Sequence, residues 1–179
     1  MKPEFILDQN LRFVPIDPDA LRKYVAELAQ KAKQTSDVQE QVALQGELGV
    51  YLRSLDLFDE AMAVLSSALQ KIKEHNLGLR IEIQNRIRLA HVYQEAKQYQ
   101  LSDSLFLQVV EICRTVPEVE SFLHFALQHS GKNEFDQGRY ATALHFFEEA
   151  LAIRLRSSAP ADQIESTRAA IARVKELIV

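Results

Sequence analysis

The sequence has few of the residues that cross-link, interrupt or anchor a fold. Cys113 is the only cysteine among 179 residues, so no disulfide can form within the chain, and a reducing cytoplasm is the expected compartment. Five glycines and five prolines favour long helices joined by short turns. No run of about 18 apolar residues is present, and residues 1–4 lead into no signal-peptide core, so we expect no membrane segment.

Composition narrows the partner class. The formal net charge of −4 argues against nucleic acid as the main partner, because nucleic-acid-binding domains are usually basic. Hydrophobic residues make up 47% of the chain and charged residues 26%, which is typical of a soluble domain with an ample core. The length fits one domain.

The clearest pattern is a register that repeats every 41 residues. One column is small, and the column four residues later is large and apolar. A third column, twelve residues before the first, is again small. The three columns are Ala20, Ala61, Ser102 and Ala143; Tyr24, Leu65, Phe106 and Phe147; and Gly49, Ala90 and Gly131. A fixed period of this kind predicts an array of stacked units, which presents an extended binding surface instead of a buried pocket.

Within residues 42–157, three copies share one order of small and large residues. The copies read Leu48, Gly49, Leu52, Leu55, Phe58, Ala61, Leu65 and Ala68; Leu89, Ala90, Tyr93, Ala96, Tyr99, Ser102, Phe106 and Val109; and Gly131, Phe135, Gly138, Tyr140, Ala143, Phe147 and Ala150. This order resembles the tetratricopeptide repeat, whose usual period is about 34 residues. The longer period resembles kinesin light chains and MalT-type bacterial regulators, and it implies helices extended by about two turns in total.

The resemblance implies an all-α fold, a right-handed α-α superhelix of about eight helices. We expect an extended arm that packs on the array, either in its own chain or in a neighbour's, because Pro3 and Pro15 discourage a helix there. Ser130 and Glu134 replace apolar residues in the third copy, so its first helix is expected to pack loosely or bend. The expected segments are the arm 1–16, a half repeat 17–35, repeats at about 37–76, 79–116 and 117–157, and a capping helix 162–178.

No catalytic motif is found. The run from Ser130 to Asn133 is similar to the end of a phosphate-binding loop, but Ala126 stands where that loop needs glycine and no strand precedes it. Gly131 is better explained as a packing residue. Cys113 lies among apolar neighbours and is expected to be a buried hydrophobe instead of a reactive thiol. We therefore expect no enzyme activity and no cofactor.

The histidines do not suggest a metal site. His124 and His129 are five residues apart and diverge on a helix, whereas shared ligation needs a spacing of three or four. His91 and Glu95 have the right spacing, but two ligands are too few for a stable site.

In proteins resembling this one, ligands touch four positions on the inner face of each repeat's first helix. Transferring these positions gives a candidate partner-binding set: Arg53, Gln84, Ile87, His91, Gln94, Phe125, Gln128, Lys132, Phe135 and Arg173. We expect Phe125 and Phe135 to be exposed anchors and the cations to meet acidic groups. The alternative, a solvated wall with scattered charge, stays open.

The expected function is a protein-interaction module, an adaptor or assembly factor that captures a peptide, helix or partner loop. The alternative is a regulatory sensor whose peptide or partner binding changes its curvature or oligomeric state. Receptors of this family for chaperone tails use paired lysines and asparagines, and this chain has Gly46, Val50, Ile87 and His91 there, which argues against that role. The apolar end from Leu177 to Val179 suggests a homodimer.

Overall fold

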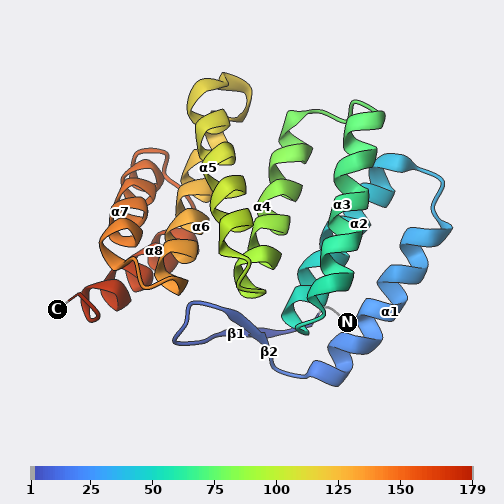
Figure 1. The fold of residues 1–179 in the computed structure, drawn as a ribbon, viewed down its shortest axis with the longest axis horizontal. Coiled ribbons are helices and arrows are strands. Elements are labelled where there is room, and N and C mark those ends of the chain that lie inside the picture. The colour runs from blue at the N-terminus through green and yellow to red at the C-terminus, as the bar shows by residue number, and fades with distance from the viewer. Residues whose placement is uncertain (1–2, 179) are drawn as a thin grey trace. The chain divides into compact units, whose positions relative to one another are not determined.

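The computed structural model describes residues 3–178, in which eight α-helices follow a short β-hairpin (Figure 1). The elements are β1 (Phe5–Leu7), β2 (Phe13–Pro15), α1 (Pro18–Gln34), α2 (Val38–Ser54), α3 (Phe58–Glu74), α4 (Leu79–Glu95), α5 (Tyr99–Thr115), the 3-10 helix η1 (Pro117–Phe122), α6 (Leu123–Asp136), α7 (Tyr140–Arg156) and α8 (Ala161–Lys175). The all-α class is confirmed. Helices α2 and α4 begin 41 residues apart, as do α3, α5 and α7, so the register in the sequence is the register of the helices.

The helices group into two compact units, Met1–Gln98 and Tyr99–Val179, which we describe separately. In the first unit, α2 packs against α1, α3 and α4, and α3 also packs against α4. Leu21, Leu65 and Ile83 are fully buried between these helices. Val42, Ala68 and Ile72 form a further apolar cluster. In the second unit, α6 packs against α5 and α7, α7 packs against α8, and Phe106, Leu127 and Phe147 are buried.

The small-residue columns mark the places where two helices come closest. A Cβ atom added at Gly49 would lie 2.5 Å from Leu65 Cγ, and one added at Gly131 would lie 2.6 Å from Phe147 Cε1. Ala61 and Ala143 are fully buried. A large side chain from one helix therefore occupies the space that the small residue of its partner leaves open, as the register predicts.

The turn inside each repeat uses a left-handed residue at the same register position. Asp56, Lys97 and Gly138 all have φ between 59° and 72°, although only one of them is glycine. After α2, the N–H of Asp56 donates to Arg53 O at 2.9 Å, and the N–H of the next residue donates to Leu52 O at 3.0 Å. The same two bonds recur after α4 and α6. They satisfy carbonyls that a helix end leaves open.

The left-handed residue that forms the turn between repeats is absent at one place, Pro117. The equivalent residues, Asn76 and Ser158, have φ of 51°, whereas the proline ring fixes φ near −65°. The chain therefore continues into η1, and α6 begins only at Leu123. The expected long helix at the start of the third repeat is thus a 3-10 turn followed by a shorter α-helix, and its cause is the proline instead of Ser130, which is buried.

The N-terminal segment folds back on itself as a hairpin instead of running as one extended arm. Its strands pair antiparallel, with Ile6 opposite Val14. The Phe5 ring stacks on Tyr51 of α2 at 6.0 Å, so the hairpin lies on the first unit of its own chain. Residues 1 and 2 of the expected arm lie outside the described residues.

Candidate functional site

In the first unit, α2 and α4 form a common wall through an ion pair. Arg53 Nη1 lies 3.5 Å from Glu95 Oε1, and only 14% and 13% of the two side chains are exposed. The charge of Arg53 is therefore balanced inside the chain. It is a poor candidate for recognising an acidic partner, contrary to the expectation from the sequence.

A second cation lies on this wall that the sequence patterns did not indicate. The guanidinium of Arg88 on α4 lies across Gly46 of α2, where an added Cβ would come within 2.1 Å of Nη1. Arg88 Nη1 donates to Asn85 Oδ1 at 3.2 Å. Burial lowers the pKa of Arg88, and the nearby Glu47 carboxylate partly opposes this shift. The missing Cβ of Gly46 thus leaves the space that the guanidinium of Arg88 occupies.

Tyrosines surround the same carboxylate. Glu47 Oε1 accepts a hydrogen bond from Tyr51 Oη at 3.1 Å and one from Tyr24 Oη at 3.4 Å. Desolvation, followed by the negative charge of Glu47, raises the pKa of Tyr51 to about 12. The stacked Phe5 ring adds to this desolvation, so the hairpin, the two tyrosines and Glu47 form one cluster.

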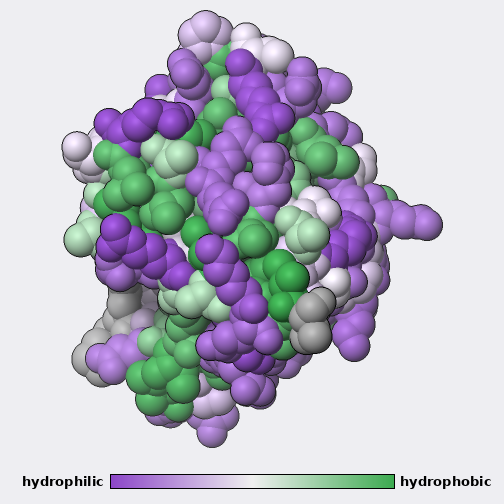
Figure 2. All heavy atoms as spheres, turned by 90° about the vertical axis from the view of Figure 1, so that its left-hand side faces the viewer, coloured by the Kyte–Doolittle hydropathy of each residue, from purple (hydrophilic) through white to green (hydrophobic). Residues whose placement is uncertain are grey.

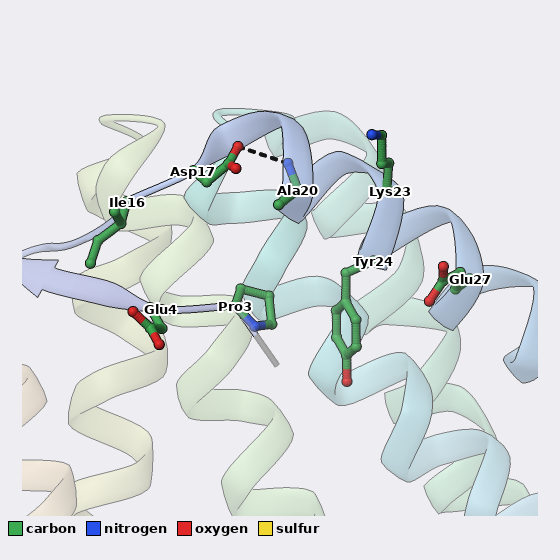
Figure 3. Close-up of a pocket in the computed structure, with 8 residues that line it drawn as sticks. All are labelled: Pro3, Glu4, Ile16, Asp17, Ala20, Lys23, Tyr24 and Glu27. Carbon is green, nitrogen blue, oxygen red and sulfur yellow. Dashed lines mark hydrogen bonds between the residues drawn. The ribbon is translucent and has the colours of Figure 1, made fainter. Parts of the chain in front are cut away.

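A cavity of about 350 Å³ lies between the ends of the hairpin and α1 (Figure 3). Its lining is Pro3, Glu4, Ile16, Asp17, Ala20, Lys23, Tyr24 and Glu27. Asp17 is already used as the helix cap, since its carboxylate accepts from the N–H of Asp19 and from that of Ala20 at 2.9 Å. The remaining charges are two glutamates and one lysine at the rim, which do not form a constellation for acid–base chemistry.

In the second unit, the two phenylalanines of α6 differ in how far their side chains are exposed. Phe125 is 38% exposed, and its ring meets the edge of His129 at 4.1 Å. Phe135 is 7% exposed and packs against Tyr140 at 5.6 Å. The expectation that Phe135 is an exposed anchor was therefore wrong, because the start of α7 covers it.

Polar side chains converge where α6, α7 and α8 meet. Arg154 of α7 is 3% exposed, and its Nη1 donates to the Gln163 carbonyl at 2.8 Å. Its Nε donates to His124 Nδ1 at 3.2 Å. Burial, followed by the charge of Arg154, lowers the pKa of His124.

The comparisons with known proteins agree with this geometry. Residues 79–156 match the family model described as tetratricopeptide repeat. Residues 79–156 are therefore tetratricopeptide repeats. Such repeats are generally protein–protein interaction modules, and the fold is typically a non-catalytic scaffold.

Solved structures show the same fold at low sequence identity. One match is the crystal structure of tetratricopeptide-like repeats from a Podosopora anserina protein described as a kinesin light chain. Its TM-score is 0.58 at 18% identity, over 89% of this chain and 84% of that one. A second crystal structure of those repeats, of a single-residue variant, gives 0.57 at 20%, over 89% and 76%. BtubC (BKLC) from P. vanneervenii gives 0.64 at 14%, over 88% and 73%. No curated protein matches the sequence. The expected superhelical fold, with its longer repeat, is confirmed.

The members of the candidate partner-binding set differ in burial. Gln84 and Phe125 are exposed, whereas Arg53, Lys132 and Arg173 are partly buried. Buried members are Ile87, His91, Gln94, Gln128 and Phe135. The reason is packing: α4 touches α2 and α3, and α6 touches α5 and α7, so each helix leaves only a narrow strip to solvent.

Other chemistry finds little support among residues 3–178. No group of three histidine, cysteine, aspartate or glutamate side chains there is placed to hold a metal ion. Within the same range, each helix is too short or too polar to cross a membrane. Cys113 is fully buried, and desolvation raises the pKa of its thiol to about 11, as expected for a core residue.

Proposed function

We propose that this protein is an adaptor or assembly factor that holds a peptide, helix or loop of a partner protein on the first helices of its repeats. The observation that carries the proposal is Phe125. It is an exposed aromatic on α6, where Leu127 and Phe135 are buried and Leu123 is partly buried. Exposed aromatic side chains are enriched at protein interfaces, where they anchor the partner.

The neighbouring side chains suit this role. Lys132 lies two turns after Phe125 on α6, at a spacing that places both near one side of the helix. An apolar residue of the partner would cover Phe125, while a carboxylate nearby would meet the cation. In the first unit, Gln84 offers an exposed amide on the equivalent helix α4.

The test is capture of a partner from cytosol, followed by substitution. The wild-type chain serves as bait, and mass spectrometry identifies what it retains. We expect Phe125→Ala combined with Lys132→Glu to abolish recovery of that partner while helicity and melting stay unchanged. The matched control is Leu107→Ala, which removes an exposed apolar side chain from α5, the second helix of its repeat. Equal loss in the control, or capture that survives the double change, would refute the proposed surface.

The regulatory sensor makes a different prediction in the same assay. A sensor changes its oligomeric state or shape when the captured partner is added, which light scattering and small-angle scattering measure. An adaptor forms a complex with unchanged array dimensions. The cytoplasmic location and the exclusion of nucleic acid stay predictions that rest on the single cysteine and the net charge.

Self-association also stays a proposal. On the face that carries α7 and α8, apolar patches are interrupted by hydrophilic side chains (Figure 2). Leu155 and Ile178 are exposed large apolar residues at the ends of these helices, and Val179 lies outside the described residues. Light scattering at high micromolar concentration should give the mass of a dimer; a monomer would remove the idea.

A further inference from the structure

The last repeat replaces an apolar core layer by a polar one. His124 occupies the register position of Val42 and Ile83, and Arg154 occupies that of Ile72 and Cys113. In the first unit this layer is hydrophobic, with Val42 and Ile72 in one cluster. We call the substituted set the polar layer: His124 and Gln128 of α6, Arg154 of α7, and Gln163 and Thr167 of α8.

Arg154 is the charge at the centre of this layer. Its Nη1 donates to the Gln163 carbonyl, to Thr167 Oγ1 and, at 3.4 Å, to Gln128 Oε1. Each of these acceptors is neutral, as is His124 Nδ1, which accepts from Nε.

The side chains and carbonyl that Arg154 contacts within residues 3–178 are all neutral, although only 3% of its surface is exposed. Burial lowers the pKa of Arg154, and the charge of Asp162, at the start of α8, only partly opposes this shift. A buried cation without a contacting counter-ion is unfavourable unless an anion reaches it.

The bonds around Arg154 also fix the directions of its neighbours. Because Nδ1 of His124 accepts, the neutral ring carries its proton on Nε2. Because Oε1 of Gln128 accepts, the amide nitrogen points away from the guanidinium, and this buried Nε2 has no hydrogen-bond partner in the described part of the chain. Gln128 Nε2 is thus a buried donor without an acceptor in the described part of the chain, beside a guanidinium whose hydrogen-bond partners are all neutral.

Gln163 completes the set. Its side-chain Oε1 is buried without a partner among the described residues, and no hydrogen bond there fixes the orientation of this amide. A half-turn of the amide would present its nitrogen as a further donor. His124 and Gln163 are only partly buried, so the polar layer reaches the surface of the second unit.

From this buried amide donor without a partner, beside a buried cation that contacts only neutral acceptors, we propose that the polar layer receives a side-chain carboxylate, from an aspartate or glutamate of the partner protein. This inference rests on the proposed function and adds the chemistry of the partner. Arginine and amide donors match the geometry of a carboxylate, and charge-assisted bonds are the stronger ones. Phe125 lies one turn before Gln128 on α6, so an apolar residue near the acidic one would contact the exposed ring.

The first test uses small probes on the wild-type chain. N-acetyl-glutamate amide should shift the NMR signals of the Gln128 side-chain amide and the His124 ring, whereas the isosteric N-acetyl-glutamine amide should bind at least about tenfold more weakly. Inorganic phosphate is the third arm. Equal binding of the two amides, no shift with the carboxylate, or shifts with phosphate alone would each overturn the carboxylate assignment.

The second test places the carboxylate inside the chain. Gln128→Glu puts an anion beside Arg154, so we expect the melting temperature to rise by about 2–4 °C and the response to the glutamate probe to disappear. Gln108→Glu, at an exposed position in the middle of α5, is the control for added charge and should change neither. A lower melting temperature for Gln128→Glu would show that the guanidinium does not need an anion, and would refute the proposal.

Partner capture separates the two proposals. Loss of the captured partner in both Phe125→Ala and Gln128→Glu supports both. If Phe125→Ala loses the partner and Gln128→Glu keeps it, the carboxylate site is wrong while the proposed function stands. If Phe125→Ala also keeps it, the proposed surface fails as well.

Discussion

Gly131→Ala tests the close approach of α6 and α7 with the smallest change available. The added Cβ would lie 2.6, 2.7 and 3.0 Å from Cε1, Cδ1 and Cζ of Phe147. All three distances are shorter than ordinary van der Waals contact, which begins at about 3.5 Å between carbon atoms. The Phe147 ring is fully buried, so it can only move by displacing its neighbours.

Two effects of opposite sign decide the outcome. Overpacking a buried site costs about 1–3 kcal/mol. Alanine in a helix interior recovers about 1 kcal/mol relative to glycine. The free energy of unfolding should therefore fall by about 1 kcal/mol, with a range of about 0–2. For a chain of this length, the melting temperature should fall by about 2–4 °C.

Gly46→Ala is the matched comparison, because its new Cβ meets the Nη1 end of Arg88. A guanidinium at the end of a flexible side chain moves more cheaply than a buried ring, so this variant should lose less stability than Gly131→Ala. The chain contains no tryptophan, so urea and thermal unfolding are best followed by far-ultraviolet circular dichroism. If Gly131→Ala is more stable than the wild type, the close-packing argument for the small-residue column is refuted.

Three further predictions follow from the described contacts. Ala61→Leu and Ala143→Leu should each lower the free energy of unfolding by about 1–3 kcal/mol, because both sites are fully buried; melts at the wild-type temperature would contradict this. Cys113 should resist iodoacetamide at pH 8 in the folded chain and react after urea unfolding, since burial raises its pKa to about 11; fast labelling of the folded chain would contradict it. Tyr51 has its pKa raised to about 12 against 10 when unfolded, so the stability it contributes is present below pH 10 and is lost between pH 10 and 12, which urea midpoints across that range should show.

Periodicity made the helical array predictable because each column repeats one physical requirement. A small residue at Gly49 or Gly131 and a large one at Leu65 or Phe147 must face each other in every repeat. The break at Pro117 was visible as a proline but not as a 3-10 turn. Its effect depends on the positive φ that the equivalent residues adopt, and φ cannot be read from composition.

The candidate site was less predictable because exposure depends on neighbours far along the chain. Phe125 and Phe135 look equivalent in the sequence, yet Tyr140 of the next helix covers only the second. Arg88 was missed because the inner positions were transferred from a resemblance, which points to Ile87 instead. Arg154 did carry a usable sign, since a cation replaces Ile72 and Cys113 in one register column.

The left-handed turn residues offer a way to stabilise the protein at positions outside the candidate partner-binding set. Asp56 and Lys97 are exposed, and each adopts a conformation that costs a residue with a side chain about 1–2 kcal/mol, whereas Gly138 adopts it freely. Exchanging either residue for glycine is therefore a route to a more robust array. Stabilising substitutions at these two turns would leave the first helices of the repeats unchanged, so those helices could be redesigned to bind other partners.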